Sequence, residues 1–427
     1  MALVDNYRVA GDADDTASFT RALAANGLVE LGGKTYTISG TIALTSNKRL
    51  TGQGSGVSII RMAQQSLPAI TIAAGANAVQ IDNLAVTRPI NAPGLANGDG
   101  IQCLGASEGV SLTSVELSHH FRCFVGRNTN GGTLKSVGAS QCNSHGFELS
   151  HNPNLVPNVP LQWSLTDCGS GFASGNGFYV HSETYTGAAG TYGNVSLGTY
   201  TNLTTFANAG NGLRVEGNAR VAVHSVRLFG GFFGEDGQDG VYVDGGPNGS
   251  AQDQGARGTN HIIAPNFVEL AGLGYSGPYN DPSTGTLVQK TNAVGRFLTL
   301  TASQSGVGVK VSHCINAIIR PAVVNGATWD GIFTHNVRGV SVQNVQVSNN
   351  GLNVSGGRRN GIYLYQCERQ QVTGCRVFGQ ERGLAWTNND IVITGNDFRD
   401  NSSGPYAGPG ATALPNSTCV GNLPSNV

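Results

Sequence analysis

The chain repeats a short phrase around glycine, and this repeat limits its fold more than any other feature. In each copy a polar or turn residue precedes the glycine, and apolar and variable residues alternate after it. The eight copies are GDGIQCL, SHGFELS, GNGFYVHS, GNGLRVEG, QDGVYVDGG, GVGVKVSH, WDGIFTHN and RNGIYLYQ. Such self-similarity is typical of a solenoid, in which each repeat buries its apolar face against its neighbours.

The spacing of the phrases matches the coils of a parallel β-helix. Their glycines lie at positions 100, 146, 177, 212, 240, 308, 331 and 361, at intervals of 46, 31, 35, 28, 68, 23 and 30 residues. We interpret the interval of 68 as two coils of 34 residues. A β-sandwich or a propeller is the alternative, but sandwich turns recur every ~8–12 residues, and propeller blades repeat more uniformly.

Alternation within each phrase predicts which side chains face the core. Because successive residues of a strand point to opposite faces, the residue after each glycine should lie inside the solenoid. The composition agrees, since Gly accounts for 62 of 427 residues and charged residues for only 12%, as expected for an all-β fold of short strands and tight turns. The predicted core ladder consists of Ile101, Phe147, Phe178, Leu213, Val241, Val309, Ile332 and Ile362.

The second and fourth residues after each glycine should face outward and form two external ladders. The middle copies place aromatic, basic and acidic side chains there, whereas a purely structural exterior would carry small polar residues. Aromatic rings pack on the apolar faces of sugars, Arg binds carboxylates, and carboxylates act as acid and base. The predicted substrate-binding residues are Tyr179, His181, Arg214 and Tyr242.

Glu216 and Asp244 are the first candidates for catalysis. They occupy the same outward position in consecutive copies, so we expect them on adjacent coils, where like-charge repulsion would raise one pKa. One would act as the acid and the other as the nucleophile or base of a glycosidase. The alternative is a solvated charge pair on an exposed face.

The stretch GEDGQDG adds two further catalytic candidates, Asp236 and Asp239. Asp239 directly precedes a glycine, as Asp330 does in WDGIF, so a turn-forming role is an equal alternative for it. The histidines show no metal-binding spacing, and we expect no cofactor and no metal. A Ca²⁺-dependent lyase that uses the acidic GEDGQDG loop is a further alternative.

The opening of the chain resembles a known superfamily. The segments GDADDTASFTRAL, GLVELGGKTYTISG and LTGQGSGVSIIRM are similar to the start of the pectate-lyase-like β-helices, and to phage tailspikes in particular. The resemblance implies a single-stranded right-handed parallel β-helix and a homotrimer that digests host lipopolysaccharide, capsule or exopolysaccharide. It also implies a virion protein of the phage tail, made in the host cytoplasm and acting at the bacterial surface.

We expect three segments along the chain: an N-terminal cap over residues 1–40, the β-helix over 41–400, and a C-terminal loop or arm over 401–427. Residues 14–27 should include a short helix in which Phe19, Ala22 and Leu23 share a face and Asp15 caps the N-terminus. The eight cysteines form no CxxC pair, and we expect most of them to be reduced core residues.

Charge and hydropathy argue against two kinds of partner. The formal net charge of -1 gives no field to attract nucleic acid. No apolar run reaches the ~18 residues of a membrane span, so membrane insertion is not expected, and the start lacks the regions of a signal peptide.

Three functions fit these features. A glycoside hydrolase with paired carboxylates comes first, because carboxylates are the densest candidate groups, and its partner would be a bacterial surface polysaccharide. A polysaccharide lyase or epimerase would remove the C5 proton of a uronate, with His181 or a tyrosine as base and Arg214 or Lys310 near the carboxylate. A non-catalytic receptor-binding spike would need only the aromatic residues.

Overall fold

The computed structural model describes most of the chain. The described residues are 2–105, 107–127, 131–151, 161–183, 193–218, 221–246, 258–272, 278–280, 287–289, 306–351, 359–388, 390–403, 406–407 and 418–420. The chain divides into two compact units, the first mainly Met1–Asn152 with Pro160–His181 and the second mainly Ser182–Gly277 with Lys290–Val427. Most of the predicted arm over 401–427 lies outside the described residues, and the three predicted segments stay a prediction.

Two short helices begin the first unit: a 3-10 helix, η1 (Val4–Tyr7), and an α-helix, α1 (Thr16–Ala25). The helix α1 buries the predicted face of Phe19, Ala22 and Leu23. Phe19 packs edge-on against Tyr36, with ring centres 5.5 Å apart. Burial of such side chains contributes roughly 1.5–3 kcal/mol each, so the helix is fixed to the coils by its apolar face.

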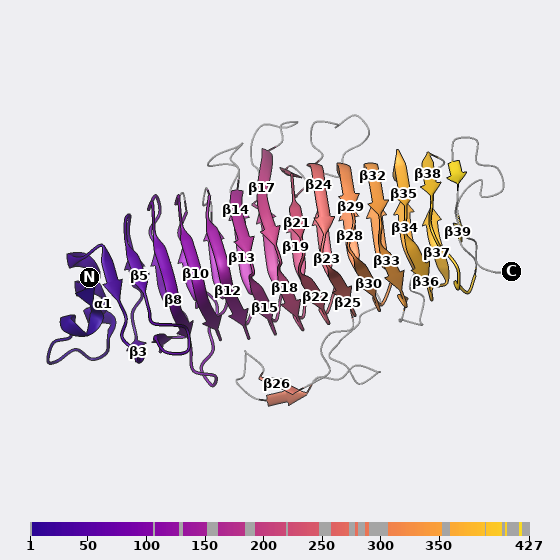
Figure 1. Ribbon diagram of the computed structural model, residues 1–427. Coiled ribbons are helices and arrows are strands. Elements are labelled where there is room, and N and C mark those ends of the chain that lie inside the picture. The colour runs from indigo at the N-terminus through magenta and orange to yellow at the C-terminus, as the bar shows by residue number, and fades with distance from the viewer. Residues whose placement is uncertain are drawn as a thin grey trace. The chain divides into compact units, whose positions relative to one another are not determined.

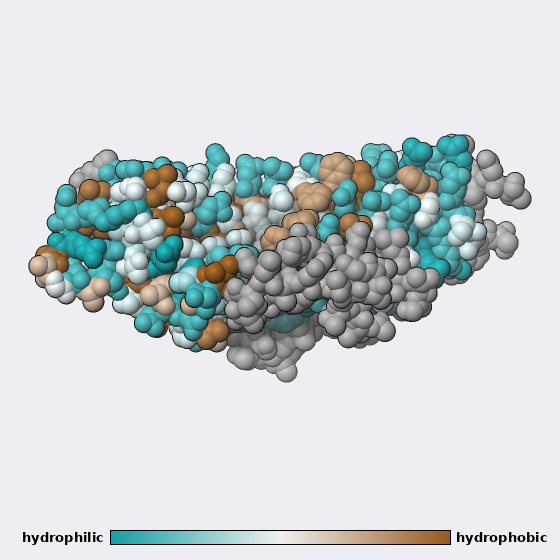
Figure 2. Space-filling view, turned by 90° about the horizontal axis from the view of Figure 1, so that it is seen from below, coloured by the Kyte–Doolittle hydropathy of each residue, from teal (hydrophilic) through white to brown (hydrophobic). Residues whose placement is uncertain are grey.

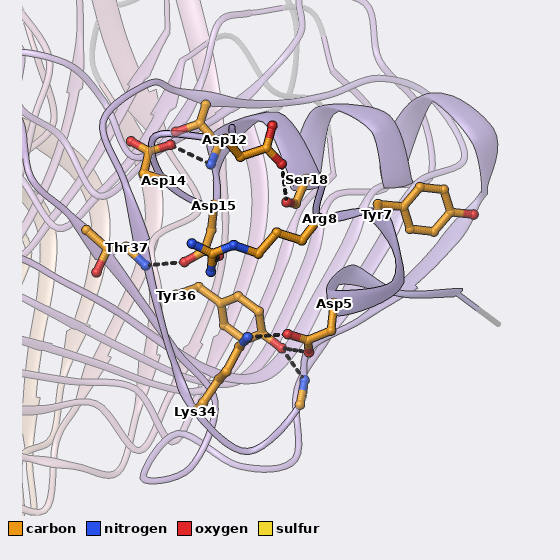
Figure 3. A network of polar contacts seen from close by, with 12 residues as sticks. Asp5, Tyr7, Arg8, Asp12, Asp14, Asp15, Ser18, Lys34, Tyr36 and Thr37 are labelled. Carbon is orange, nitrogen blue, oxygen red and sulfur yellow. Dashed lines mark hydrogen bonds and ion pairs between the residues drawn. The ribbon is translucent and has the colours of Figure 1, made fainter. Parts of the chain in front are cut away.

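A polar network also connects α1 to the first coils (Figure 3). Asp15 is the N-cap residue of α1, as predicted, but its side chain makes no capping bond and instead accepts the Thr37 amide and an Arg8 guanidinium, each at 2.8 Å. Asp14 Oδ1 accepts the amide of Thr16 at 2.8 Å. Asp14 therefore satisfies a free amide at the helix start, while Asp15 connects the helix to the neighbouring strand.

The first unit is a stack of parallel coils, coloured indigo to magenta in Figure 1. Successive coils pair strand on strand, as Ile101, Phe124 and Phe147 do in register. An antiparallel pair, β26 (Pro278–Asn280) and β27 (Leu287–Gln289), also belongs to this unit. The coil strands are β1 (Ala2–Leu3), β2 (Leu28–Glu30), β3 (Thr35–Ile38), β4 (Ile42–Leu44), β5 (Arg49–Thr51), β6 (Ile59–Met62), β7 (Ile70–Ile72), β8 (Gln80–Thr87), β9 (Ile101–Cys103), β10 (Ser111–Ser118), β11 (Phe124–Arg127), β12 (Thr133–Ser140), β13 (Phe147–His151), β14 (Leu161–Thr166), β15 (Gly169–Gly171) and β16 (Phe178–Ser182).

The second unit repeats the same architecture. One of its parallel sheets runs in the order β19, β23, β28, β31, β34, β37 and β39. Its strands are β17 (Gly193–Thr201), β18 (Thr204–Phe206), β19 (Leu213–Glu216), β20 (Val221–His224), β21 (Arg227–Phe229), β22 (Phe232–Gly234), β23 (Val241–Asp244), β24 (Gly258–Ala264), β25 (Phe267–Glu269), β28 (Val309–Ser312), β29 (Cys314–Ile319), β30 (Val323–Asn325), β31 (Ile332–His335), β32 (Arg338–Gln343), β33 (Gln346–Ser348), β34 (Asn360–Tyr365), β35 (Gln370–Thr373), β36 (Arg376–Phe378), β37 (Arg382–Trp386), β38 (Ile391–Thr394), β39 (Tyr406–Ala407) and β40 (Thr418–Val420).

The core ladders lie where the repeat predicts them. In the second unit Leu213 pairs with Val241, Val241 with Val309, and Val309 with Ile332. All four are fully buried. Because a slip of one residue would exchange the two faces of a strand, this pattern also fixes which residues face outward. The predicted fold class, an all-β parallel β-helix with a short N-terminal helix, is confirmed.

The intervals between phrases divide differently from the prediction. Val241 pairs directly with Val309, so the interval of 68 residues is one coil with long insertions and not two coils. Phe124 lies in register between Ile101 and Phe147, so the interval of 46 residues contains two coils. The extra coil has Cys123 in place of the glycine, which is why the repeat does not reveal it.

The cysteines are mostly reduced and buried, as expected, with one exception. Five buried cysteines form no disulfide bond, namely Cys103, Cys168, Cys314, Cys367 and Cys375. Cys123 and Cys142 form a disulfide across 6.1 Å between their Cα atoms. This bond was not part of the prediction.

None of the helices in the described stretches is long and apolar enough to cross a membrane.

Candidate functional site

The strands β19, β23 and β28 bring the central outward positions of the second unit side by side. Arg214 pairs with Tyr242 and Tyr242 with Lys310, while Glu216 pairs with Asp244. Paired strands lie about 4.8 Å apart, and all five side chains are partly exposed. We call this surface the acid–base face.

Glu216 forms an ion pair within its own strand. Its Oε2 accepts Arg214 Nε at 2.9 Å and Nη2 at 2.6 Å. The Glu216 side chain is 20% exposed and that of Arg214 is 34% exposed. The carboxylate is therefore held in one orientation at a surface that a ligand can reach.

Asp244 accepts hydrogen bonds at both of its oxygens. The Tyr242 hydroxyl donates to Oδ2 at 3.0 Å, and the Gly246 amide donates to Oδ1 at 3.1 Å. His313 Nδ1 lies 3.0 Å from the same Oδ1. His313 follows the end of β28 in a turn with φ of 52°. This carboxylate thus contacts a phenol and an imidazole, two groups that can donate or accept a proton.

The ring of Tyr242 lies within reach of two cations. Lys310 Nζ is 4.4 Å from its centroid, and the Arg214 guanidinium carbon is 5.6 Å away. Both distances are within the range of cation–π attraction. Burial and the neighbouring Asp244 carboxylate raise the pKa of Tyr242, so its hydroxyl stays protonated at neutral pH and donates to Asp244.

Asp236, one of the two candidates from the acidic loop, is fully buried. It accepts Thr205 Oγ1 at 2.7 Å, the Asn208 amide at 3.1 Å and Asn208 Nδ2 at 2.9 Å. Burial raises its pKa to about 7, although these hydrogen bonds act in the opposite direction. The hydrogen bonds of Asp236 connect two coils. Because its side chain is not exposed to solvent, it does not contribute to the acid–base face.

Asp239 belongs to a ladder of polar side chains that connects successive coils. It is 3% exposed, and its Oδ1 accepts the Val307 amide at 2.9 Å. Asn211 Oδ1 accepts the Asp239 amide at 3.1 Å, and Asp330 Oδ1 accepts the Asn360 amide at 3.0 Å. Asp and Asn before glycine therefore bond the backbone of the next coil. Asp239 Oδ2 also lies 3.8 Å from Lys310 Nζ, so it contacts one of the two cations of the acid–base face.

Tyr179 and His181 belong to the first unit, where they stack on each other with ring centres 4.4 Å apart. His181 Nε2 lies 3.4 Å from Oε1 of Glu148, a residue of β13. Arg122 donates to both oxygens of Glu148, at 3.2 and 3.1 Å. Burial alone would raise the pKa of Glu148, but the His181 and Arg122 contacts outweigh it and lower the pKa to about 2. Glu148 is thus an anion that orients His181.

The sequence does not single out two of these residues as site members. His313 comes after the outward position of β28, so strand alternation says nothing about its direction, although it lies one coil from Asp244. Glu148 does occupy an outward position, and its only sequence signal is a carboxylate one repeat before Tyr179. Across the described stretches, no group of three or more His, Cys, Asp or Glu side chains could hold a metal ion.

Comparisons with protein families and with curated proteins give one partial match. A family model described as periplasmic copper-binding protein (NosD) matches residues 277–422. No curated protein matches the chain.

Solved structures match the chain over nearly its whole length. The N-terminal fragment of bacteriophage phi29 gene product 12 has a TM-score of 0.68 and 14% identity, over 98% of this chain and 71% of that one. Tailspike protein 3 of bacteriophage CBA120 has a TM-score of 0.64 and 11% identity, over 100% of this chain and 62% of that one. The A-module of a mannuronan C-5 epimerase from Azotobacter vinelandii has a TM-score of 0.59 and 16% identity, over 100% of both chains. The chain is therefore a parallel β-helix protein, similar in fold to phage tailspikes.

Proposed function

We propose that this chain binds and cuts an acidic bacterial surface polysaccharide by glycoside hydrolysis at the acid–base face of the second unit. The observation that carries the proposal is the register pairing of Glu216 with Asp244 beside Arg214, Tyr242 and Lys310. A glycosidase needs two carboxyl groups on either side of the scissile bond. The two strands supply such groups at a partly exposed surface.

In this reaction one carboxyl group protonates the leaving glycosidic oxygen as the C–O bond breaks. The other either attacks the anomeric carbon or takes a proton from the water that does so. The water oxygen and one of its protons end as the new anomeric hydroxyl. The other proton of the water replaces the one that the acid gave to the leaving oxygen. Tyr242 and His313 position Asp244, and Arg214 positions Glu216.

Two cations favour an anionic substrate. The guanidinium of Arg214 and the ammonium of Lys310 lie on either side of Tyr242 in the strand order β19, β23, β28. A sugar carboxylate bound between them would gain charge-assisted hydrogen bonds. The tyrosine ring offers an apolar surface for a pyranose face. We therefore expect uronates or other acidic sugars in the polymer.

The fold comparisons support a phage origin as part of this proposal. Similar solved structures include a bacteriophage tailspike protein and a mannuronan C-5 epimerase. On this basis we propose a phage tail protein that acts at the bacterial surface as a homotrimer.

A second candidate function rests on the first unit. The ionised Glu148 orients His181 at 3.4 Å, which is the arrangement of a histidine base with a carboxylate partner. In a lyase, His181 would remove the C5 proton of a uronate. The electron pair would form a C4–C5 double bond as the C4–O bond breaks, and the leaving oxygen would take a proton from the protonated His181 or from water. An epimerase would return a proton to the opposite face instead.

The test is cleavage of a panel of purified capsule, exopolysaccharide and O-antigen polysaccharides. Glu216→Gln and Asp244→Asn should each reduce turnover by about 10²-fold or more while leaving polysaccharide binding intact. Glu368→Gln is the matched control, because that side chain is 62% exposed and lies outside the face. If His181→Ala stops cleavage and both carboxylate variants cut normally, elimination is the reaction. If the parental chain binds a polysaccharide of the panel but cuts none of them, the chain is a binding spike.

A further inference from the structure

Four aromatic rings continue the acid–base face along the same sheet of the second unit. Phe333 and His335 lie on β31, and Tyr363 and Tyr365 lie on β34. In register, Phe333 pairs with Tyr363 and His335 with Tyr365. We call these four residues the aromatic platform.

The rings of the platform contact one another in a connected group. Ring centres lie 5.5 Å apart for Phe333 and Tyr363, 5.3 Å for His335 and Tyr365, and 5.8 Å for Tyr363 and Tyr365. Phe333 is 7% exposed and forms the base of the platform. The other three side chains are partly exposed. Mutual packing fixes the rings before a ligand binds. Binding would therefore cost little side-chain entropy in the protein.

The platform is continuous with the acid–base face. Lys310 pairs with Phe333, and Ser312 with His335. The His313 ring, which contacts Asp244, lies 5.0 Å from the His335 ring. Counted from the strand of Asp244, β31 and β34 are two and three strands away, or about 10 and 14 Å. A chain of pyranose units lying along the sheet could contact both surfaces at once.

We propose that the aromatic platform is a sugar-stacking subsite that binds pyranose units on one side of the bond to be cut. This inference rests on the proposed function and adds the direction in which the substrate lies. The C–H faces of pyranose rings are apolar and pack on aromatic faces, while the tyrosine hydroxyls remain able to bond sugar hydroxyls. Burial lowers the pKa of His335, so its ring stays uncharged at neutral pH and suits an apolar sugar face.

The acid–base face and the platform would therefore bind different sugar units of the same substrate. The cations Arg214 and Lys310 select acidic units at the scissile bond. The platform, which contains no carboxylate and no basic side chain charged at neutral pH, binds neighbouring units through their C–H faces. A polymer whose repeat contains both acidic and neutral pyranoses fits this arrangement.

Binding is the direct test, measured by calorimetry with the polysaccharide of the panel that the parental chain binds most tightly. Asp244→Asn serves as the background in which the polymer stays intact. Added to it, Tyr363→Ala and Tyr365→Ala should each weaken binding by about 3- to 10-fold. Tyr363→Phe should retain most of the binding, since it keeps the ring. Phe267→Ala is the control, because Phe267 is 44% exposed on β25 in a different sheet.

In the chain that retains Asp244, and so cuts the polymer, the same tyrosine variants should raise KM with little change in kcat. They remove binding interactions that are made equally in the ground and transition states. Unchanged binding in both alanine variants would overturn the subsite, whether or not Glu216→Gln and Asp244→Asn stop cleavage. A lower melting temperature with parental affinity would also overturn it, because the rings would then only pack on one another. If the parental chain binds no polysaccharide of the panel, both the subsite and the proposed function are wrong.

Discussion

At the scale of single residues, Asp236 predicts how stability depends on pH. Its folded-state pKa is raised from 3.8 to about 7, so the folded chain keeps a proton that the unfolded chain releases. Below pH ~4 both states are protonated, and stability should fall as pH rises from about 4 to 7 and stay low above that range. Asn is close in shape to the protonated carboxyl group. Asp236→Asn should therefore match the parent at pH 4 and exceed it at pH 8 in urea unfolding.

Two results for Asp236→Asn would contradict this account, one for stability and one for cleavage. If Asp236→Asn is no more stable at pH 8 than the parent, the buried carboxyl group carries no charge penalty. If it abolishes cleavage while remaining folded, the acidic loop performs the chemistry and the acid–base face does not.

Tyr242 is predicted to act through its hydroxyl as well as its ring. Tyr242→Phe keeps the ring between Arg214 and Lys310 but removes the hydrogen bond to Asp244, which spans 3.0 Å. Because a hydrogen bond to a charged group contributes about 1.5–3 kcal/mol, we expect turnover to fall by about 10- to 100-fold with little loss of binding. Kinetics and calorimetry on the same polysaccharide separate the two. A parental kcat in Tyr242→Phe would contradict a role for the hydroxyl and limit Tyr242 to stacking through its ring.

Residues such as these show what strand alternation can and cannot predict. The period of two places Glu216 and Asp244 outward and in register, because both follow a buried valine in the same phrase. It does not predict that His313 contacts Asp244, since this depends on a turn residue with positive φ. It also does not predict that Asp236 is buried, because hydrogen bonds from Thr205 and Asn208 on the preceding coil compensate for burying a carboxyl group.

At the scale of elements, the inward ladder predicts where the coils are most sensitive. Leu213 is fully buried between register neighbours, and Leu213→Ala should lower the free energy of unfolding by about 2–5 kcal/mol. Val392→Ala, at a position 40% exposed on β38, should change it by less than about 0.5 kcal/mol. Urea unfolding of both variants checks the register. Equal effects at the two positions would contradict it.

The lengths of the coils are harder to predict than their strands. The glycine phrase identifies β19, β23, β28, β31 and β34 because each has a glycine where a Cβ atom would meet the backbone of the next coil. It misses β11, where Cys123 occupies the equivalent position and forms a disulfide with Cys142. It also misreads the interval before β28, because an insertion changes the spacing without changing the pairing of strands. At α1 the direction of the Asp15 side chain depends on its contact with Thr37 of the neighbouring strand, which composition does not reveal.

At the scale of the whole molecule, the homotrimer is a prediction from the resemblance to tailspikes. Figure 2 shows hydrophobic residues in small groups among hydrophilic ones on the face seen from below. The sequence offers Leu104 and Phe333 as outward apolar residues for the interface between subunits. Leu104 is 50% exposed and suits this role, whereas Phe333 is 7% exposed and packs within the aromatic platform. Light scattering at micromolar concentration should give three times the chain mass of 44.1 kDa. A mass of one chain would contradict the trimer and leave the fold unaffected.

Cleavage in water labelled with heavy oxygen tests the central claim most directly. The panel polysaccharide that the parental chain degrades is digested in this water, and the products are analysed by mass spectrometry. Hydrolysis at Glu216 and Asp244 predicts one heavy oxygen atom at each new reducing end, and loss of these products in Glu216→Gln and Asp244→Asn. Products that contain no heavy oxygen and carry an unsaturated end would contradict hydrolysis and assign the chemistry to elimination.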